Sequence, residues 1–145
     1  GPTALMLAAQ EGHERVVELL LQRGAEINKQ NSNGNTALLT ATANGHERVV
    51  DLLMQHGAEI NKQGNGGWNA LMFAANQGHP AIVLRLLRAG ADRKLRTEDG
   101  RTALQLAKEN GNAECVKVLA EAAAAADGRA GAGGACSGAA AAAVD

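Results

Sequence analysis

A segment of about 33 residues occurs four times along the chain, and it constrains the fold more than any other feature. The segment "GPTALMLAAQEGHERVVELLLQRGAEINKQ" from Gly1 returns almost unchanged as "GNTALLTATANGHERVVDLLMQHGAEINKQ" from Gly34. More divergent copies begin at Gly67 and Gly100. A repeat of this length is typical of solenoids, in which each copy is one structural unit stacked on the next. Equivalent positions of the four copies are therefore expected to face the same way.

Each copy predicts two short helices and a projecting loop. In every copy a Thr or Asn that favours the helix N-cap precedes an apolar run, which a glycine ends. A second amphipathic helix follows at once, as in "HERVVELLLQRG". The remaining stretch, "GAEINKQNSNGN" and its counterparts, is rich in Asn and Gly and predicts a hairpin-like finger. Helices this short are marginal alone, so their stability must come from stacking. The predicted N-cap residues are Thr3, Thr36, Asn69 and Thr102.

Three motifs recur in the copies: a Gly-x-Thr-Ala-Leu opening, an Ala-Ala-x-x-Gly-His centre and a Leu-Leu-x-x-Gly-Ala-x-Ile-Asn close. With the 33-residue period, they make residues 1–122 resemble an ankyrin-repeat array. The resemblance implies an all-α solenoid of helix-turn-helix units with projecting β-hairpin fingers. The usual Thr-Pro-Leu-His of the family is Thr-Ala-Leu-Met in the first copy, and the other copies lack it too. The array therefore lacks a preorganising proline and a histidine that ties successive repeats in the family.

The two ends of the chain differ from the array. Residues 123–145 are rich in Ala and Gly; we expect the alanines before Asp127 to extend the last helix and the Gly-rich centre to be disordered. Gly1-Pro2 fits either a native fragment or the remnant of a cleaved tag. Without a polar capping repeat, the N-terminal apolar edge should be exposed, so we expect further repeats or another domain before it.

Composition argues against several function classes. The 14 Lys and Arg nearly balance the 15 Asp and Glu, which disfavours a general nucleic-acid binder. No apolar run approaches the roughly 20 residues that span a bilayer, so no membrane partner is predicted. Cys115 and Cys136 do not make a disulfide framework, which favours an intracellular location, cytoplasmic or nuclear. The array is expected to be monomeric.

Three patterns resemble chemical sites but predict none. His13, His46 and His79 recur once per copy, yet a repeat step of roughly 10 Å is too long for one zinc ion; we expect each to bond local backbone. The glycines of "GNGGW" lack the Lys-Ser/Thr pair of a phosphate loop and are explained by a finger that needs positive φ. Ser137 in "ACSGA" has no His or acid placed to serve it. The sequence therefore predicts no catalytic residues, no metal and no cofactor.

Trp68 and Phe73 are the only aromatic residues of the chain. Phe73 replaces Leu7, Thr40 and Leu106 of the other copies, and we expect it to pack in the core beside Thr40. Trp68 stands at a finger position whose equivalents tolerate exposure. Two interpretations are open: Trp68 lies flat on a neighbouring finger, or a partner buries it, as is typical of interface hot spots. The predicted site is built on the second.

The predicted partner-binding surface combines the fingers with the ends of the first helices, as the resemblance implies. Neutral amides dominate it, while charge shifts from acidic in the first two copies to basic in the third and fourth. Arg96 and Arg101 flank the last finger; they either receive an acidic segment of the partner or are ordinary solvated charges. The candidate residues are Gln10, Glu11, Ser32, Asn33, Asn35, Asn44, Asn65, Trp68, Asn76, Gln77, Glu98, Asp99, Arg101, Glu109 and Asn110.

These observations predict a non-catalytic protein interaction module that binds another protein on its concave surface. The alternative is the targeting or regulatory region of a larger enzyme, such as a ligase, a kinase or a bacterial effector, whose catalytic domain lies elsewhere. The same scaffold serves many unrelated functions, so the partner is not predicted.

Overall fold

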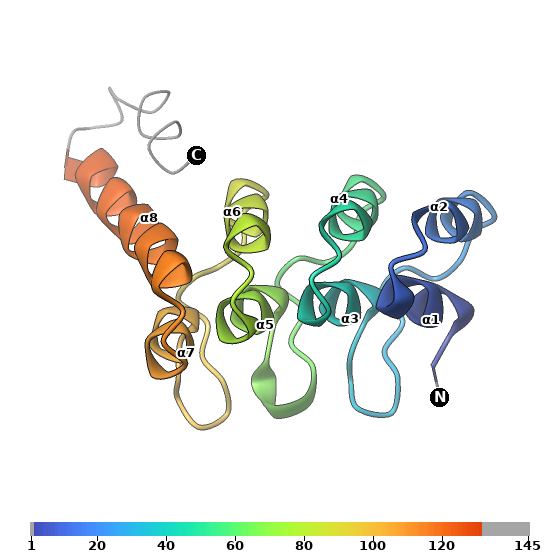
Figure 1. Cartoon of the computed structure of the whole chain (residues 1–145), viewed down its shortest axis with the longest axis horizontal. Coiled ribbons are helices and arrows are strands. Elements are labelled where there is room, and N and C mark those ends of the chain that lie inside the picture. Colours follow the sequence, from blue (N-terminus) through green and yellow to red (C-terminus); the bar gives the residue numbers. More distant parts are fainter. Residues whose placement is uncertain (1, 132–145) are drawn as a thin grey trace.

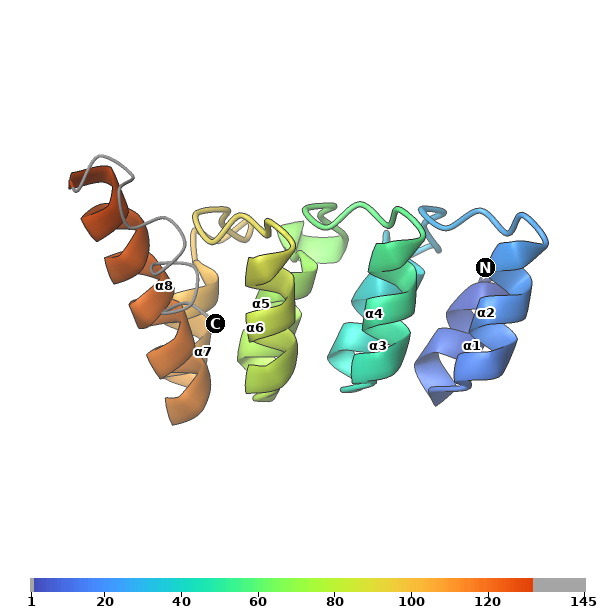
Figure 2. The same ribbon diagram turned by 90° about the horizontal axis from the view of Figure 1, so that it is seen from above.

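The computed structural model describes the backbone of residues 2–131 and the side chains of residues 2–125. In this part of the chain eight α-helices form two rows that run side by side (Figures 1 and 2). The inner row consists of α1 (Ala4–Glu11), α3 (Ala37–Ala43), α5 (Ala70–Gln77) and α7 (Ala103–Glu109). The outer row consists of α2 (Glu14–Gln22), α4 (Glu47–Gln55), α6 (Pro80–Arg88) and α8 (Ala113–Gly131). A short 3-10 helix, η1 (Asn65–Gly67), lies in the second finger. The all-α solenoid is confirmed.

Each inner helix begins at the predicted N-cap. The Thr3 hydroxyl accepts a hydrogen bond from the backbone N–H of Met6 at 3.1 Å, and the Asn69 side chain accepts one from Met72 at 3.0 Å. Thr36 and Thr102 do the same in their repeats. Each cap satisfies one of the backbone donors that a helix leaves unpaired at its first turn. Four short helices of like sequence therefore begin in the same register.

The core is a continuous strip of aliphatic side chains between the two rows. On the inner row, Ala9, Ala41, Ala74 and Ala75 are completely buried, which lets neighbouring helix backbones approach closely. Valine and leucine from the outer helices fill the space behind them, so the core contains no fully buried aromatic side chain among the described residues. Lateral packing supplies the stability that helices of seven to nine residues lack alone.

The fingers project past the inner row, but none forms the expected β-hairpin (Figure 1): no strand occurs among residues 2–131. One backbone bond closes the base of each finger, as between the Gly64 N–H and the Trp68 carbonyl at 2.8 Å, and a turn bond lies within it, as between the Gly67 N–H and the Gly64 carbonyl at 3.0 Å. In the first finger the Asn31 side chain accepts from the backbone N–H groups of Asn33 and Asn35. Short side-chain and turn bonds thus take the place of a ladder. The glycines of "GNGGW" were expected to need positive φ, and in the second finger φ is 71° for Gly66.

The expectation that the recurrent histidines bond local backbone is wrong for His46. Its Nε2 lies 2.8 Å from the carbonyl oxygen of Gln10 in the preceding repeat, and its ring packs against Gly12. Asn112, at the equivalent position of the last repeat, donates from Nδ2 to the Ala75 carbonyl at 2.7 Å. This position therefore ties the second repeat to the first and the fourth repeat to the third.

The two ends of the array present different surfaces. At the N-terminal end Leu7, Val16 and Leu19 are 51%, 45% and 41% exposed, whereas Val49, equivalent to Val16, is 1% exposed under the preceding repeat. The apolar edge expected there is thus present. At the other end α8 continues through the alanines to Gly131. Residues 132–145, which include Cys136, Ser137 and most of the predicted tail, lie outside the described residues.

Candidate functional site

The two aromatic rings of the chain form a pair at the root of the second finger. Trp68 ends the finger and Phe73 lies in the first turns of α5, with ring centroids 5.2 Å apart and planes tilted by 45°. This tilted arrangement is one that aromatic pairs prefer. Both side chains are half-buried and pack against the edge of the core. Trp68 therefore packs on a residue of the inner helix of its own repeat, and Phe73, expected in the core, stands at its margin.

Four asparagines surround this pair and complete a shallow hollow of about 330 Å³, which we call the amide hollow. Two of them come from the first finger, one from the second finger and one from the end of α5. Amide groups offer both hydrogen-bond donors and acceptors without net charge. A floor of two aromatic rings inside a rim of neutral amides suits an apolar side chain with peptide groups on either side. The lining residues are Asn33, Asn35, Asn65, Trp68, Phe73 and Asn76.

Five of the six lining residues were candidate residues of the sequence analysis, and the structure brings them together. Asn110 adjoins the amide hollow because its Nδ2 donates to Oδ1 of Asn76 at 2.6 Å. The other candidates do not line it; they are Gln10, Glu11, Ser32, Asn44, Gln77, Glu98, Asp99, Arg101 and Glu109. Phe73 is the lining residue that sequence reasoning missed. The signal that could have identified it is its position five residues after the single tryptophan, which places the two aromatic side chains close together in the chain.

Arg101 is engaged within its own repeat. Its guanidinium lies 3.0 Å from a carboxylate oxygen of Asp99 and 2.7 Å from one of Glu109. A hydrogen bond from the Thr97 hydroxyl, together with the bond from Arg101, lowers the pKa of Asp99, while Asp99 and Glu109 raise the pKa of Arg101. These bonds fix the last finger against the end of α7. Arg101 therefore already has two carboxylate partners within the chain, and its contact with an acidic partner segment stays a prediction.

The outer row has its own charge cluster. Arg85 on α6 forms an ion pair with Asp51 on α4 and lies 3.4 Å from Glu47 on the same helix. The hydrogen bond with Asp51 is the main reason that the pKa of Arg85 is raised. Acidic residues of the second repeat thus pair with a basic residue of the third. Part of the change in charge along the sequence therefore serves to hold neighbouring repeats together.

Within the described residues no three His, Cys, Asp or Glu side chains gather as metal ligands would. Cys115 on α8 is buried with its Sγ 3.8 Å from the Ala74 carbonyl oxygen, and burial raises the pKa of its thiol. None of the described helices is long and apolar enough to cross a membrane.

Stacked helix pairs with projecting fingers define a solenoid repeat protein. A family model described as "Ankyrin repeats (3 copies)" matches residues 1–64 and 61–132, so the chain belongs to the ankyrin-repeat family. Ankyrin repeats are generally protein–protein interaction modules. The comparison with curated proteins found no match.

Proposed function

We propose that this protein binds a partner protein through the amide hollow, with Trp68 as the anchor of the contact. The observation that carries the proposal is the pairing of Trp68 with Phe73 beneath four asparagines from three different elements. Tryptophan is enriched among the few residues that dominate interface energies, most often where the rim of the interface excludes water from it. The asparagines would form that rim here.

The chemistry of the amide hollow indicates what kind of segment fits it. Its walls carry no charged side chain, so an extended stretch with an apolar residue is favoured over a strongly charged one. The apolar side chain would cover the exposed part of the aromatic pair. Backbone N–H and C=O groups on both sides of it would bond to the amides, which serve as donor and acceptor at once.

Affinity capture from a cell lysate tests the proposal, with the full chain and three variants as bait. Trp68→Ala removes the anchor, and Asn33→Arg places a bulky charge at the rim without touching the aromatic pair. Arg48→Ala, on the exposed face of α4, is the matched control. Proteins held by the parent and by Arg48→Ala but lost from both hollow variants support the proposal. Loss of a hot-spot residue costs about 2 kcal/mol, a roughly 30-fold drop in affinity.

Because Trp68 is the only tryptophan, it also reports binding directly. A chain labelled with 5-fluorotryptophan gives one fluorine resonance from position 68, and a captured partner should shift it on titration. If the partner binds without moving this resonance, or if Trp68→Ala binds as tightly as the parent at equal helicity, the anchor role is wrong.

A further inference from the structure

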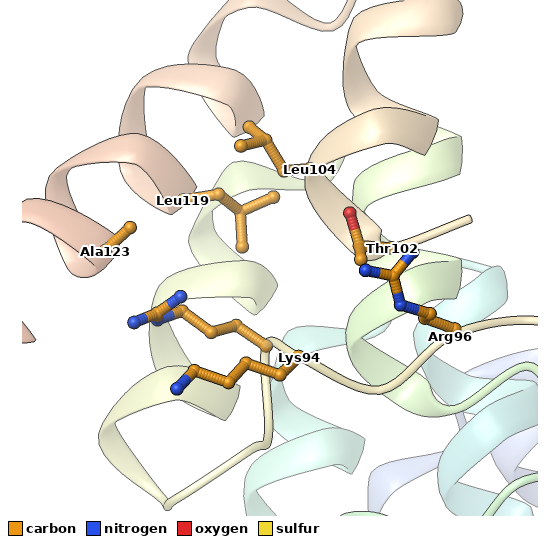
Figure 3. A pocket seen from close by; sticks show the side chains of 7 residues that line it. Lys94, Arg96, Thr102, Leu104, Leu119 and Ala123 are labelled. Carbon is orange, nitrogen blue, oxygen red and sulfur yellow. The ribbon is translucent and has the colours of Figure 1, made fainter. Parts of the chain in front are cut away.

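A second hollow lies at the C-terminal end of the array, on residues that the amide hollow does not use (Figure 3). It measures about 250 Å³ and lies between the loop after α6 and the faces of α7 and α8. Leu104, Leu119 and Ala123 supply apolar surface, and the side chains of Arg93, Lys94 and Arg96 come from the loop. We call it the end hollow.

The repeat register shows that the cationic residues are specific to this place. In the first two repeats the position of Lys94 is occupied by Asn28 and Asn61. Each of these amides accepts a hydrogen bond from a backbone N–H of the next repeat, Asn28 from Glu59 at 2.8 Å and Asn61 from Asp92 at 2.7 Å.

The position of Arg96 shows the same change. In the earlier repeats it is occupied by Gln30 and Gln63, and Gln63 donates to the Arg96 carbonyl at 3.1 Å. The position of Arg93 holds isoleucine in the first two repeats, Ile27 and Ile60. Side chains that hold a following repeat are thus replaced by three cations, which makes another repeat of this sequence a poor occupant of the end hollow.

The apolar surface beneath these cations is left without a covering repeat at the C-terminal end of the described stack. Leu38 and Leu71, the equivalents of Leu104, are 1% and 0% exposed because the following repeat covers them. Leu104 is only half-buried. The end hollow therefore keeps the apolar character of an inter-repeat junction while its edge has changed to positive charge.

The cations of the end hollow differ from Arg85 and Arg101 in their ion pairing. Arg85 and Arg101 each form ion pairs with two carboxylates. Among the described residues, neither Arg93 nor Lys94 forms an ion pair, and the Arg96 guanidinium donates to the Gly100 carbonyl at 3.0 Å, an uncharged acceptor. Three like charges beside one apolar hollow leave a local positive potential that an anionic occupant would relieve.

We propose that the end hollow binds an acidic segment of a protein, with one aliphatic side chain inserted against Leu104 and Leu119 and flanking carboxylates on Arg93, Lys94 and Arg96. The apolar floor favours a peptide over a nucleic acid, whose phosphates would use only the cations, and the net charge of −1 gives the chain no general attraction for polyanions. This proposal does not depend on the amide hollow, since the two sites share no residue.

The test uses the full chain labelled with ¹⁵N and a synthetic amidated pentapeptide, in which one leucine is flanked on each side by two glutamates. Titration at low salt should shift the amide resonances of residues 93–104 and 119–123 and leave the Trp68 indole in place. A peptide with serine in place of leucine should bind more weakly, and a peptide with lysines in place of glutamates should not bind.

Two variants of equal charge provide the matched comparison. Arg93→Gln/Lys94→Gln removes two charges at the end hollow, and Arg15→Gln/Arg23→Gln removes two exposed charges at the opposite end of the array. Two exposed ion pairs together are worth roughly a 2- to 30-fold change in affinity, so we expect about an 8-fold loss for the first variant and almost none for the second.

Several results would overturn the proposal. They are no shift at millimolar peptide, equal losses in the two variants, or tighter binding to a single-stranded oligonucleotide or to phosphatidylserine vesicles through the same resonances. Shifts in residues 132–145 that accompany displacement from the end hollow would make the chain's own tail the occupant and would equally contradict it.

Discussion

Substitution of Gly12 by alanine tests how successive repeats are held together. Gly12 follows α1 with φ of 75°, and a Cβ atom there would lie 2.7 Å from Nδ1 of His46 in the next repeat. The ring would have to move, and its bond to the Gln10 carbonyl at 2.8 Å would be lost. Gly111 holds the same position in the last repeat with φ of 70°, but a Cβ atom there meets nothing within 4 Å. The two glycines therefore separate backbone strain from inter-repeat packing.

The magnitudes follow from these contacts. Forcing alanine into the left-handed region costs roughly 1–2 kcal/mol at either position. Gly12→Ala additionally loses a hydrogen bond worth about 0.5–1.5 kcal/mol. The free energy of unfolding should therefore fall by about 1–2 kcal/mol in Gly111→Ala and by about 1.5–3.5 kcal/mol in Gly12→Ala. Urea unfolding followed by circular dichroism measures both.

A double-mutant cycle identifies the cause of the difference. In a His46→Ala background the ring is absent, so Gly12→Ala should cost no more than Gly111→Ala. The reasoning is refuted if the two glycine substitutions are equally destabilising in the parent chain. It is also refuted if the excess cost at Gly12 persists without His46.

Three further predictions concern the core, the outer row and the buried thiol. Val49→Ala should destabilise the chain by roughly 2 kcal/mol, because two fully buried methyl groups are lost. Val16→Ala, at 45% exposure, should cost less than about 1 kcal/mol. Equal costs in urea unfolding would contradict this and would show that another surface covers Val16. Arg85→Gln should lower the free energy of unfolding by no more than about 1 kcal/mol, since the side chains of Arg85 and Asp51 are both about one-third exposed. The loss should shrink in 1 M NaCl, which screens the ion pair. A loss independent of salt would mean that Arg85 stabilises the chain by packing and not by charge. With Cys136 replaced by serine, Cys115 should react with a disulfide reagent at pH 8 only as fast as the chain opens, and rapid labelling would contradict its burial. Because folding raises the pKa of this thiol, its contribution to stability is full below the ordinary thiol pKa and is lost as pH rises above it, which unfolding at pH 7 and pH 10 would detect.

The sequence predicts the stack well because each position is sampled four times in equivalent surroundings. N-caps such as Thr3 and Asn69 depend only on hydrogen bonds within one helical turn, and the buried alanines follow from the short distance between neighbouring helices. Local chemistry and a constant period are sufficient for both. The exposed apolar edge at Val16 follows from the same logic, since its equivalents are buried only by a preceding repeat.

The sequence did not predict which hydrogen-bond, ion-pair or ring-contact partner each of several side chains takes. His46 has a backbone carbonyl available both within its repeat and in the repeat before, and only the spacing of the stack selects Gln10. Arg101 has two nearby carboxylates that the repeat pattern does not mark, because Asp99 and Glu109 lie on different elements. The contact of Trp68 with Phe73 depends on the turn made by η1, which a run of glycines leaves open.

Differences between the copies locate the two candidate surfaces. The first two copies are nearly identical, so they can supply scaffold and rim but little that distinguishes one partner from another. The aromatic pair and all three cations of the end hollow belong to the third copy, which is interior and is held by neighbours on both sides. In a stack that contacts only nearest neighbours, the terminal repeats open first and interior repeats last. Because α5 lies in this interior repeat, it should stay ordered while the ends fray, so hydrogen exchange at α5 should stay slow under conditions that already expose α1.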